Sequence, residues 1–105
     1  MQSTTTMSAS NPYRYYTDNY IFSDTSSSYL SSSDLSTLNA TSYKLALNEI
    51  YARHGRVFKN SDLSEYFYSK PWYYADSSYS DSRLSDVERA NIDTLVKYGE
   101  KKGWR

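Results

Sequence analysis

The chain has 105 residues, with 12 basic and 12 acidic side chains and a formal net charge of zero. This length allows one domain and no second core, and the balanced charge provides no field that would attract nucleic acid or an anionic membrane surface. Cysteine is absent and histidine occurs once, which excludes disulfides, thiolate metal sites and cysteine nucleophiles. We therefore expect no intrinsic metal site, no cofactor and no nucleic-acid partner.

Aromatic side chains supply much of the apolar material, since the chain contains 13 Tyr, 2 Trp and 3 Phe. Leu, Ile and Val are scarce, and such a composition by itself raises the question of disorder. Each Tyr or Trp ring, however, can bury roughly 150–250 Å², and a buried Tyr hydroxyl usually finds a hydrogen-bond partner. Together with the zero net charge, this predicts a folded domain whose core is built largely from aromatic rings.

The first residues of the chain differ from the rest. Residues 1–12, MQSTTTMSASNP, are mostly Ser, Thr and Asn with almost nothing to bury, and we expect them to form a disordered tail or linker. The domain itself is predicted to span residues 13–105. Because no apolar run approaches the roughly 18 residues of a membrane span, and the start has no apolar signal-peptide region, we expect no membrane insertion by this segment.

Residues 13–38 combine isolated apolar side chains with clusters of Ser. This spacing is typical of an irregular segment pinned to a core, with one helical turn near residues 33–37. A stronger signal begins at Asn39, because asparagine caps a helix by accepting from backbone N–H groups two or three positions on. The helix predicted over residues 40–54 has one apolar stripe. The stripe consists of Tyr43, Ala46, Leu47, Ile50, Tyr51 and His54.

The opposite face of this helix carries Glu49 and Arg53, which have the favourable i, i+4 order for an ion pair. Gly55 follows as a residue that can take left-handed dihedral angles, and we expect the helix to stop there. Asn60 then caps a second, short helix. The core-facing residues of that helix are predicted to be Leu63, Tyr66 and Phe67.

A third helix is predicted over about residues 86–101, because Ser85 and Glu88 form the S-x-x-E pattern of a capping box. Between the second and third helices lies a loop with four aromatic side chains that is too rich in Ser and Asp for a regular element. The predicted fold is therefore mainly α. It is a small single domain of about three helices, with long irregular aromatic-rich segments packed on them.

The string NEIYARHG, at residues 48–55, is followed in order by a Tyr-Phe turn, a Lys-Pro-Trp-Tyr loop and a capped closing helix. In this combination the chain resembles the YARHG domain family of bacteria, from about residue 20 to about residue 101. The resemblance implies a secreted or membrane-anchored protein of a Gram-positive bacterium. It places the domain outside the cell or at the cell surface, tethered through a segment absent from this chain. It implies no established biochemical activity.

His54 allows two interpretations. As a general base it would act with Glu49, or with a loop residue such as Asp76, in a hydrolase or lyase. As part of a structural motif with Tyr51 and Gly55, it would be a ring on the apolar stripe at a helix end, with its nitrogens bonded within the protein. The helical periodicity turns the ring toward the core, where a catalytic base would meet no substrate, and this favours the structural interpretation.

Arg53 and Arg56 flank this histidine and are candidate ligand-binding residues. Their guanidinium groups could clamp a carboxylate or phosphate through paired hydrogen bonds. Alternatively, Arg53 could pair with Glu49 while Arg56 bonds the exposed carbonyl groups at the helix end.

Trp72, Tyr73 and Tyr74 form a second candidate binding site. Aromatic faces next to Asp and Ser suit sugars or an extended peptide, because flat rings bury the apolar faces of sugars. About half of the rings in this part of the chain should instead belong to the core, since Leu and Val are scarce.

No G-x-S-x-G or S-x-x-K motif positions a serine as a nucleophile, and no glycine-rich phosphate loop is present. The hypothesis that best accounts for these observations is a non-catalytic extracellular module that binds cell-envelope polymer or a surface protein. The polymer would be peptidoglycan or an anionic wall glycopolymer. An enzyme that uses His54 as its base is one alternative, and a purely structural spacer or protein-interaction domain is another.

Overall fold

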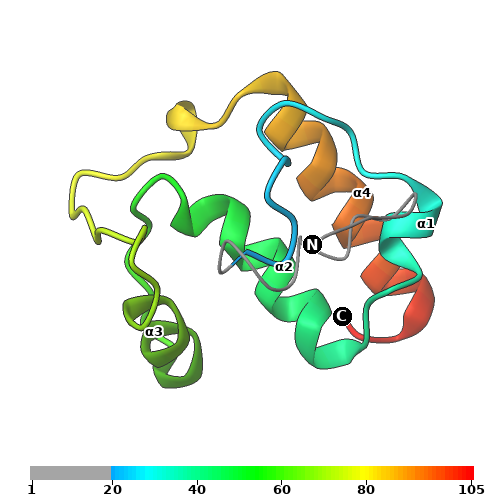
Figure 1. Ribbon diagram of the computed structural model, residues 1–105, viewed down its shortest axis with the longest axis horizontal. Helices are drawn as coiled ribbons and strands as arrows, with labels where there is room; N and C mark the ends of the chain where they lie inside the picture. Colours follow the sequence, from blue (N-terminus) through cyan, green and yellow to red (C-terminus); the bar gives the residue numbers. More distant parts are fainter. Residues whose placement is uncertain (1–19) are drawn as a thin grey trace, which may run out of the picture.

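The computed structural model describes residues 20–105, which contain four α-helices and no strand (Figure 1). The mainly helical fold is therefore confirmed, and the helical turn expected near residues 33–37 is the first of the four. Residues 1–12, expected to be a tail or linker, and residues 13–19 of the expected domain lie outside the described residues. The elements are α1 (Ser32–Leu35), α2 (Ala40–Ala52), α3 (Ser61–Tyr68), a short 3₁₀ helix η2 (Asp81–Arg83) and α4 (Asp86–Lys102).

Helix α2 lies at the centre of the described structure and packs against both α4 and α3 (Figure 1). Two buried clusters hold these helices together. The first joins α2 and α4 to the segment before α2, and it includes Phe22, Leu35, Leu38, Tyr43, Ala46, Leu47, Ile50, Leu84 and Leu95. The second joins the end of α2 to α3 and the loop after it, and it consists of Ala52, Leu63, Phe67 and Tyr73.

Residues 20–31, the N-terminal strap, run from α2 past α4 to α1 (Figure 1). The strap has no regular secondary structure, so its buried backbone N–H and C=O groups need partners elsewhere. Two buried polar side chains, one on α2 and one on α4, supply those partners.

Glu49 is the partner on α2. Its side chain is fully buried, and its carboxylate accepts hydrogen bonds from the backbone N–H of Ile21 at 2.7 Å and of Phe22 at 3.0 Å. The prediction that Glu49 lies on the outer face of the helix is therefore wrong, because the strap covers that side of α2. Burial raises the pKa of Glu49 to about 7, against the opposing effects of the two N–H groups and of the nearby positive charges of Arg53 and Lys70.

Asn91 is the partner on α4, and it is also buried. Its Oδ1 accepts from the backbone N–H of Leu30 at 2.8 Å. Its Nδ2 donates to the carbonyl oxygens of Thr25 and Ser28, both at 2.9 Å. One amide thus satisfies three backbone groups of the strap, a combination that requires both a donor and an acceptor at the same position.

The end of α2 determines where the YARHG motif points. The helix ends at Ala52, two residues before the predicted end. Gly55 then has φ of 96°, in the left-handed region that favours glycine. A Cβ at this position would lie only 2.8 Å from the Cβ of Asp76, and the Asp76 N–H donates to the Gly55 carbonyl at 2.8 Å. Gly55 therefore both ends the helix and allows the later loop to pack against it.

Candidate functional site

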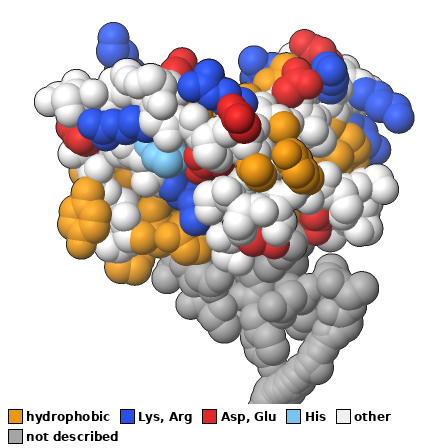
Figure 2. All heavy atoms as spheres, turned by 90° about the horizontal axis from the view of Figure 1, so that it is seen from above, with side chains coloured by type: hydrophobic (Ala, Val, Ile, Leu, Met, Phe, Trp, Pro, Cys, Tyr) orange, Lys and Arg blue, Asp and Glu red, His pale blue; other side chains and the backbone are white. Residues whose placement is uncertain are grey.

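The single histidine lies partly exposed at the surface, between the end of α2 and the start of α4 (Figure 2). Its Nε2 is 2.8 Å from Oε2 of Glu88, and the side chains of His54 and Glu88 are 27% and 2% exposed. Within residues 20–105, no protein group is hydrogen-bonded to the other ring nitrogen. The expectation of a core ring with both nitrogens bonded is not met, because the helix ends before His54 and the helical periodicity no longer applies to it.

Glu88 has two contacts that fix its position. Its Oε1 accepts from the Ser85 N–H at 2.8 Å, which completes the capping box predicted for α4, while Oε2 faces His54. Burial acts to raise the pKa of Glu88, but the hydrogen bonds from the Ser85 N–H and from His54 outweigh burial and lower it. The carboxylate therefore stays ionised near neutral pH and orients the imidazole ring.

The sequence identified Glu88 only as a capping residue and did not single out Asn91. Both residues share one face of α4 with Leu95 and Gly99, at intervals of three or four positions, and all four are buried. This spacing could have identified Glu88 and Asn91 from the sequence, since polar residues on a buried helix face need hydrogen-bond partners.

Glu49 and Asp76, the two carboxylates proposed from the sequence as partners of His54, do not contact its ring. Glu49 lies under the N-terminal strap. Asp76 accepts from the Ser78 hydroxyl at 2.7 Å and from Nη1 of Arg83 at 2.8 Å, and these bonds lower the pKa of Asp76 to about 2. Arg83 also donates to the backbone carbonyl of His54 at 2.9 Å. Asp76 therefore helps to fix the backbone at His54 and has no part in orienting its ring.

Arg53 and Trp72 are brought together by a residue of the N-terminal strap. The guanidinium carbon of Arg53 lies 4.5 Å from the centre of the Tyr20 ring, and the same ring stacks on Trp72 at 4.6 Å. The Nη1 atom of Arg53 is buried. The strap thus covers one face of each of these two candidate binding residues, and both contribute to holding it in place.

The remaining aromatic candidates divide into a core ring and a surface ring. Tyr73 is buried, and its hydroxyl donates to the Arg56 carbonyl at 2.6 Å, so we expect no direct contact between Tyr73 and a ligand. Tyr74 is 79% exposed and Tyr68 is 62% exposed. Hydrophobic side chains gather beside the histidine on the left of Figure 2, where basic side chains also reach the surface.

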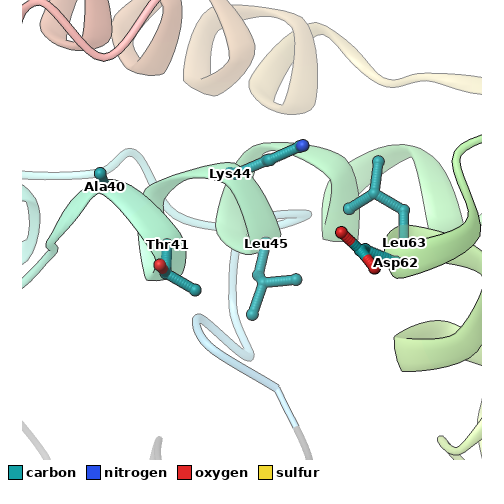
Figure 3. A pocket seen from close by; sticks show the side chains of 6 residues that line it. All are labelled: Ala40, Thr41, Lys44, Leu45, Asp62 and Leu63. Atoms are coloured by element: carbon teal, nitrogen blue, oxygen red, sulfur yellow. The ribbon is translucent and has the colours of Figure 1, made fainter.

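Three shallow cavities follow one another from the start of α2 to η2, with volumes of about 290, 410 and 330 Å³. The first lies between α2 and the start of α3, with side chains of both helices around it (Figure 3). It is lined by Ala40, Thr41, Lys44, Leu45, Asp62 and Leu63. The second is lined by Asn48, Arg56, Val57, Phe58, Lys59, Asn60 and Leu63. The third is lined by Arg56, Val57, Asp76, Ser77, Tyr79 and Asp81.

These cavities are neighbours, because they share lining residues. Leu63 lines the first and the second, and Arg56 and Val57 line the second and the third. They therefore form one series, the cavity row, with the linker between α2 and α3 at its middle. Each cavity is at the low end of the size of small-molecule sites, so the row as a whole suits an extended ligand better than a compact one. Of the candidate residues from the sequence, Arg56 lies in the row and His54 does not line it.

Two further properties of residues 20–105 bear on function. No three His, Asp or Glu side chains in this part of the chain come together as a possible metal site. None of the helices there is both long enough and apolar enough to cross a membrane.

The fold and site define a small helical domain whose N-terminal strap is held by buried polar side chains and whose Tyr-Ala-Arg-His-Gly motif ends its central helix. A family model, the YARHG domain, matches residues 18–100. The chain belongs to this family, which confirms the resemblance seen in the sequence. Searches of curated proteins and of solved structures find no match.

Proposed function

We propose that this domain is a non-catalytic binding module of a secreted or membrane-anchored bacterial protein, and that it attaches that protein to a cell-envelope polymer. The polymer is peptidoglycan or an anionic wall glycopolymer. The observation that carries the proposal is the cavity row, because three adjoining depressions match successive units of a long chain better than they match one small molecule.

The side chains of the row and its surroundings support a carbohydrate ligand. The row combines apolar side chains such as Val57 and Leu63 with amide and charged groups. The exposed Tyr74 lies two residues before Asp76, which lines the third cavity. Aromatic rings bury the apolar faces of sugars, while amide and charged groups fix their orientation.

A retention experiment tests this function. The purified domain is incubated with isolated cell walls of a Gram-positive bacterium, at low and at moderate salt, and the bound fraction is measured after sedimentation. We expect retention at both salt concentrations. No retention at either concentration would contradict the proposal.

Matched variants locate the contact. Tyr74→Ala removes an exposed ring near the row, and Val57→Glu adds a charge where the second and third cavities meet. Tyr29→Ala is the control, because Tyr29 is 69% exposed but belongs to the N-terminal strap. We expect the first two variants to lose retention and the control to keep it. Equal retention of all three would show that the wall contacts another surface.

A hydrolase or lyase is the second candidate function, and the contact between His54 and Glu88 favours it. A buried carboxylate that orients a partly exposed imidazole is an arrangement used for general-base catalysis. An enzyme of this kind would release soluble fragments from labelled cell wall, and His54→Gln would abolish the release. If neither the parent domain nor the variant releases fragments, the enzyme hypothesis fails. A spacer or protein-interaction domain would give neither release nor retention on the wall.

A further inference from the structure

We infer that the second cavity of the row binds an anionic group, a phosphodiester or a carboxylate, carried by the polymer. The inference rests on the proposed function and deepens it, since it names the charge of the ligand and the residues that meet it.

The charged side chains that line the second cavity are all positive. They belong to Arg56 and Lys59. The cavities on either side each include carboxylates, namely Asp62 in the first and Asp76 and Asp81 in the third. The second cavity is therefore the part of the row where a negative group meets cations and no lining acid.

In the part of the chain that the structure describes, no carboxylate neutralises these two cations, Arg56 and Lys59, in an ion pair. Other arginines of the same surface are engaged: Arg83 binds Asp76, and Arg89 donates to two backbone carbonyl oxygens. A cation that has no carboxylate partner in this part of the chain is available for an anionic ligand.

Contacts within the domain already hold Arg56 in place. Its guanidinium carbon lies 4.6 Å from the centre of the Tyr51 ring, a cation–π contact that restricts the side chain. Its carbonyl accepts from the buried Tyr73 hydroxyl at 2.6 Å, which fixes the backbone. Binding an anion therefore costs less side-chain ordering here than at a free surface arginine.

The cavity also contains two amide side chains, which can bind hydroxyl groups of the ligand next to its anionic group. Asn60 uses its Oδ1 to cap α3 by accepting from the N–H groups of Asp62 and Leu63, which leaves its Nδ2 as a donor. Asn48 uses its Nδ2 to donate to the Lys44 carbonyl, which leaves its Oδ1 as an acceptor. The cavity thus offers cations for a charged group and amides for hydroxyls, a combination that fits a polyol phosphate or an acidic sugar.

Calorimetric titration of the domain with three defined oligomers tests this inference. The probes are a synthetic poly(glycerol phosphate), an oligogalacturonate and an uncharged chitin oligosaccharide. The variants are Arg56→Gln and Lys59→Gln, with Lys101→Gln as the control because Lys101 is an exposed cation in the last turn of α4. Circular dichroism melting establishes that all four proteins are folded.

We expect the parent and the Lys101→Gln control to bind one of the charged oligomers more tightly than the uncharged one. Arg56→Gln and Lys59→Gln should each weaken that binding by about tenfold or more, the loss expected for one charge-assisted hydrogen bond. Preference for the phosphate or for the carboxylate oligomer identifies the source of the anion. The inference is overturned if the parent binds neither charged oligomer, or if the two variants bind as the control does.

The wall-retention experiment separates this inference from the proposed function. If both variants are still retained on cell wall, the proposed binding function is supported and the anion site is contradicted. If the parent domain itself is not retained on cell wall, the proposed function is contradicted. The oligomer titration then still decides whether the cavity binds an anion.

Discussion

Replacing Asn91 should release the N-terminal strap, and the loss of stability follows from the three hydrogen bonds that Asn91 makes to it. Asn91→Ala removes the bonds to Leu30, Thr25 and Ser28. At about 0.5–1.5 kcal/mol of net stability for each of the three bonds, the free energy of unfolding should fall by about 1.5–4.5 kcal/mol. This is a large share of the roughly 5–15 kcal/mol typical of a domain. Urea denaturation, followed by circular dichroism, measures the change.

Asn91→Asp gives a sharper test, because it keeps the shape and changes only the chemistry. Oδ1 of the aspartate can still accept from the Leu30 N–H. The amide NH₂ that donates to the Thr25 and Ser28 carbonyl oxygens is replaced by a buried, charged oxygen, which can only accept. We expect this variant to be less stable than Asn91→Ala near neutral pH and to recover in part as acid protonates the carboxylate. Asn48→Ala is the control, since the side-chain hydrogen bond of Asn48 lies within its own helix, to the Lys44 carbonyl. Equal stability of the two Asn91 variants at every pH would refute the reasoning.

Three further predictions concern stability and pH. Gly55→Ala should lower the free energy of unfolding by about 2 kcal/mol or more, because φ is 96° and the added methyl group meets Asp76. Gly103→Ala, which has open space around it, should lower it by only about 1 kcal/mol. Similar losses of stability in the two variants would contradict the contact with Asp76. Because burial raises the pKa of Glu49 from 4.5 to about 7, its contribution of about 3 kcal/mol is complete below pH 4.5 and is lost as the pH rises through 7. Urea midpoints of Glu49→Gln should lack this decline between about pH 4.5 and 7, and an unchanged decline would assign it to another group. The pKa of Glu88 is lowered, so its contribution is present above its unfolded pKa and is lost as the pH falls. Glu88→Gln should flatten the acid side of the stability profile, and a profile that falls as steeply as that of the parent would count against the contact with His54.

Local sequence signals predicted the helices well, because their causes are local. Asn39 and Ser85 begin their helices through capping boxes, as their side chains allow. Gly55 adopts the left-handed backbone expected of a glycine after a helix. The apolar positions Tyr43, Ala46, Leu47 and Ile50 of the central helix are buried as their spacing predicted.

The partners of the polar residues could not be predicted, because they come from distant parts of the chain. Glu49 has the spacing of a surface ion pair with Arg53, and only the strap, 28 positions earlier, makes it a buried acceptor. His54 follows the helical stripe in sequence but leaves it in space, since α2 ends two residues before it. Its contact with Glu88 spans 34 positions. The cavity row likewise depends on where the linker and the later loop fold back onto α2.

The central claim, that the cavity row contacts a cell-envelope polymer, is tested most directly by mapping amide chemical shifts. The isotope-labelled domain is titrated with solubilised wall polymer while its backbone amide signals are followed. The proposal predicts changes concentrated at residues 56–63 and 76–81, with little change in α1 or in the last turn of α4. Saturable changes confined to α1 or α4, or no change at any polymer concentration, would contradict it.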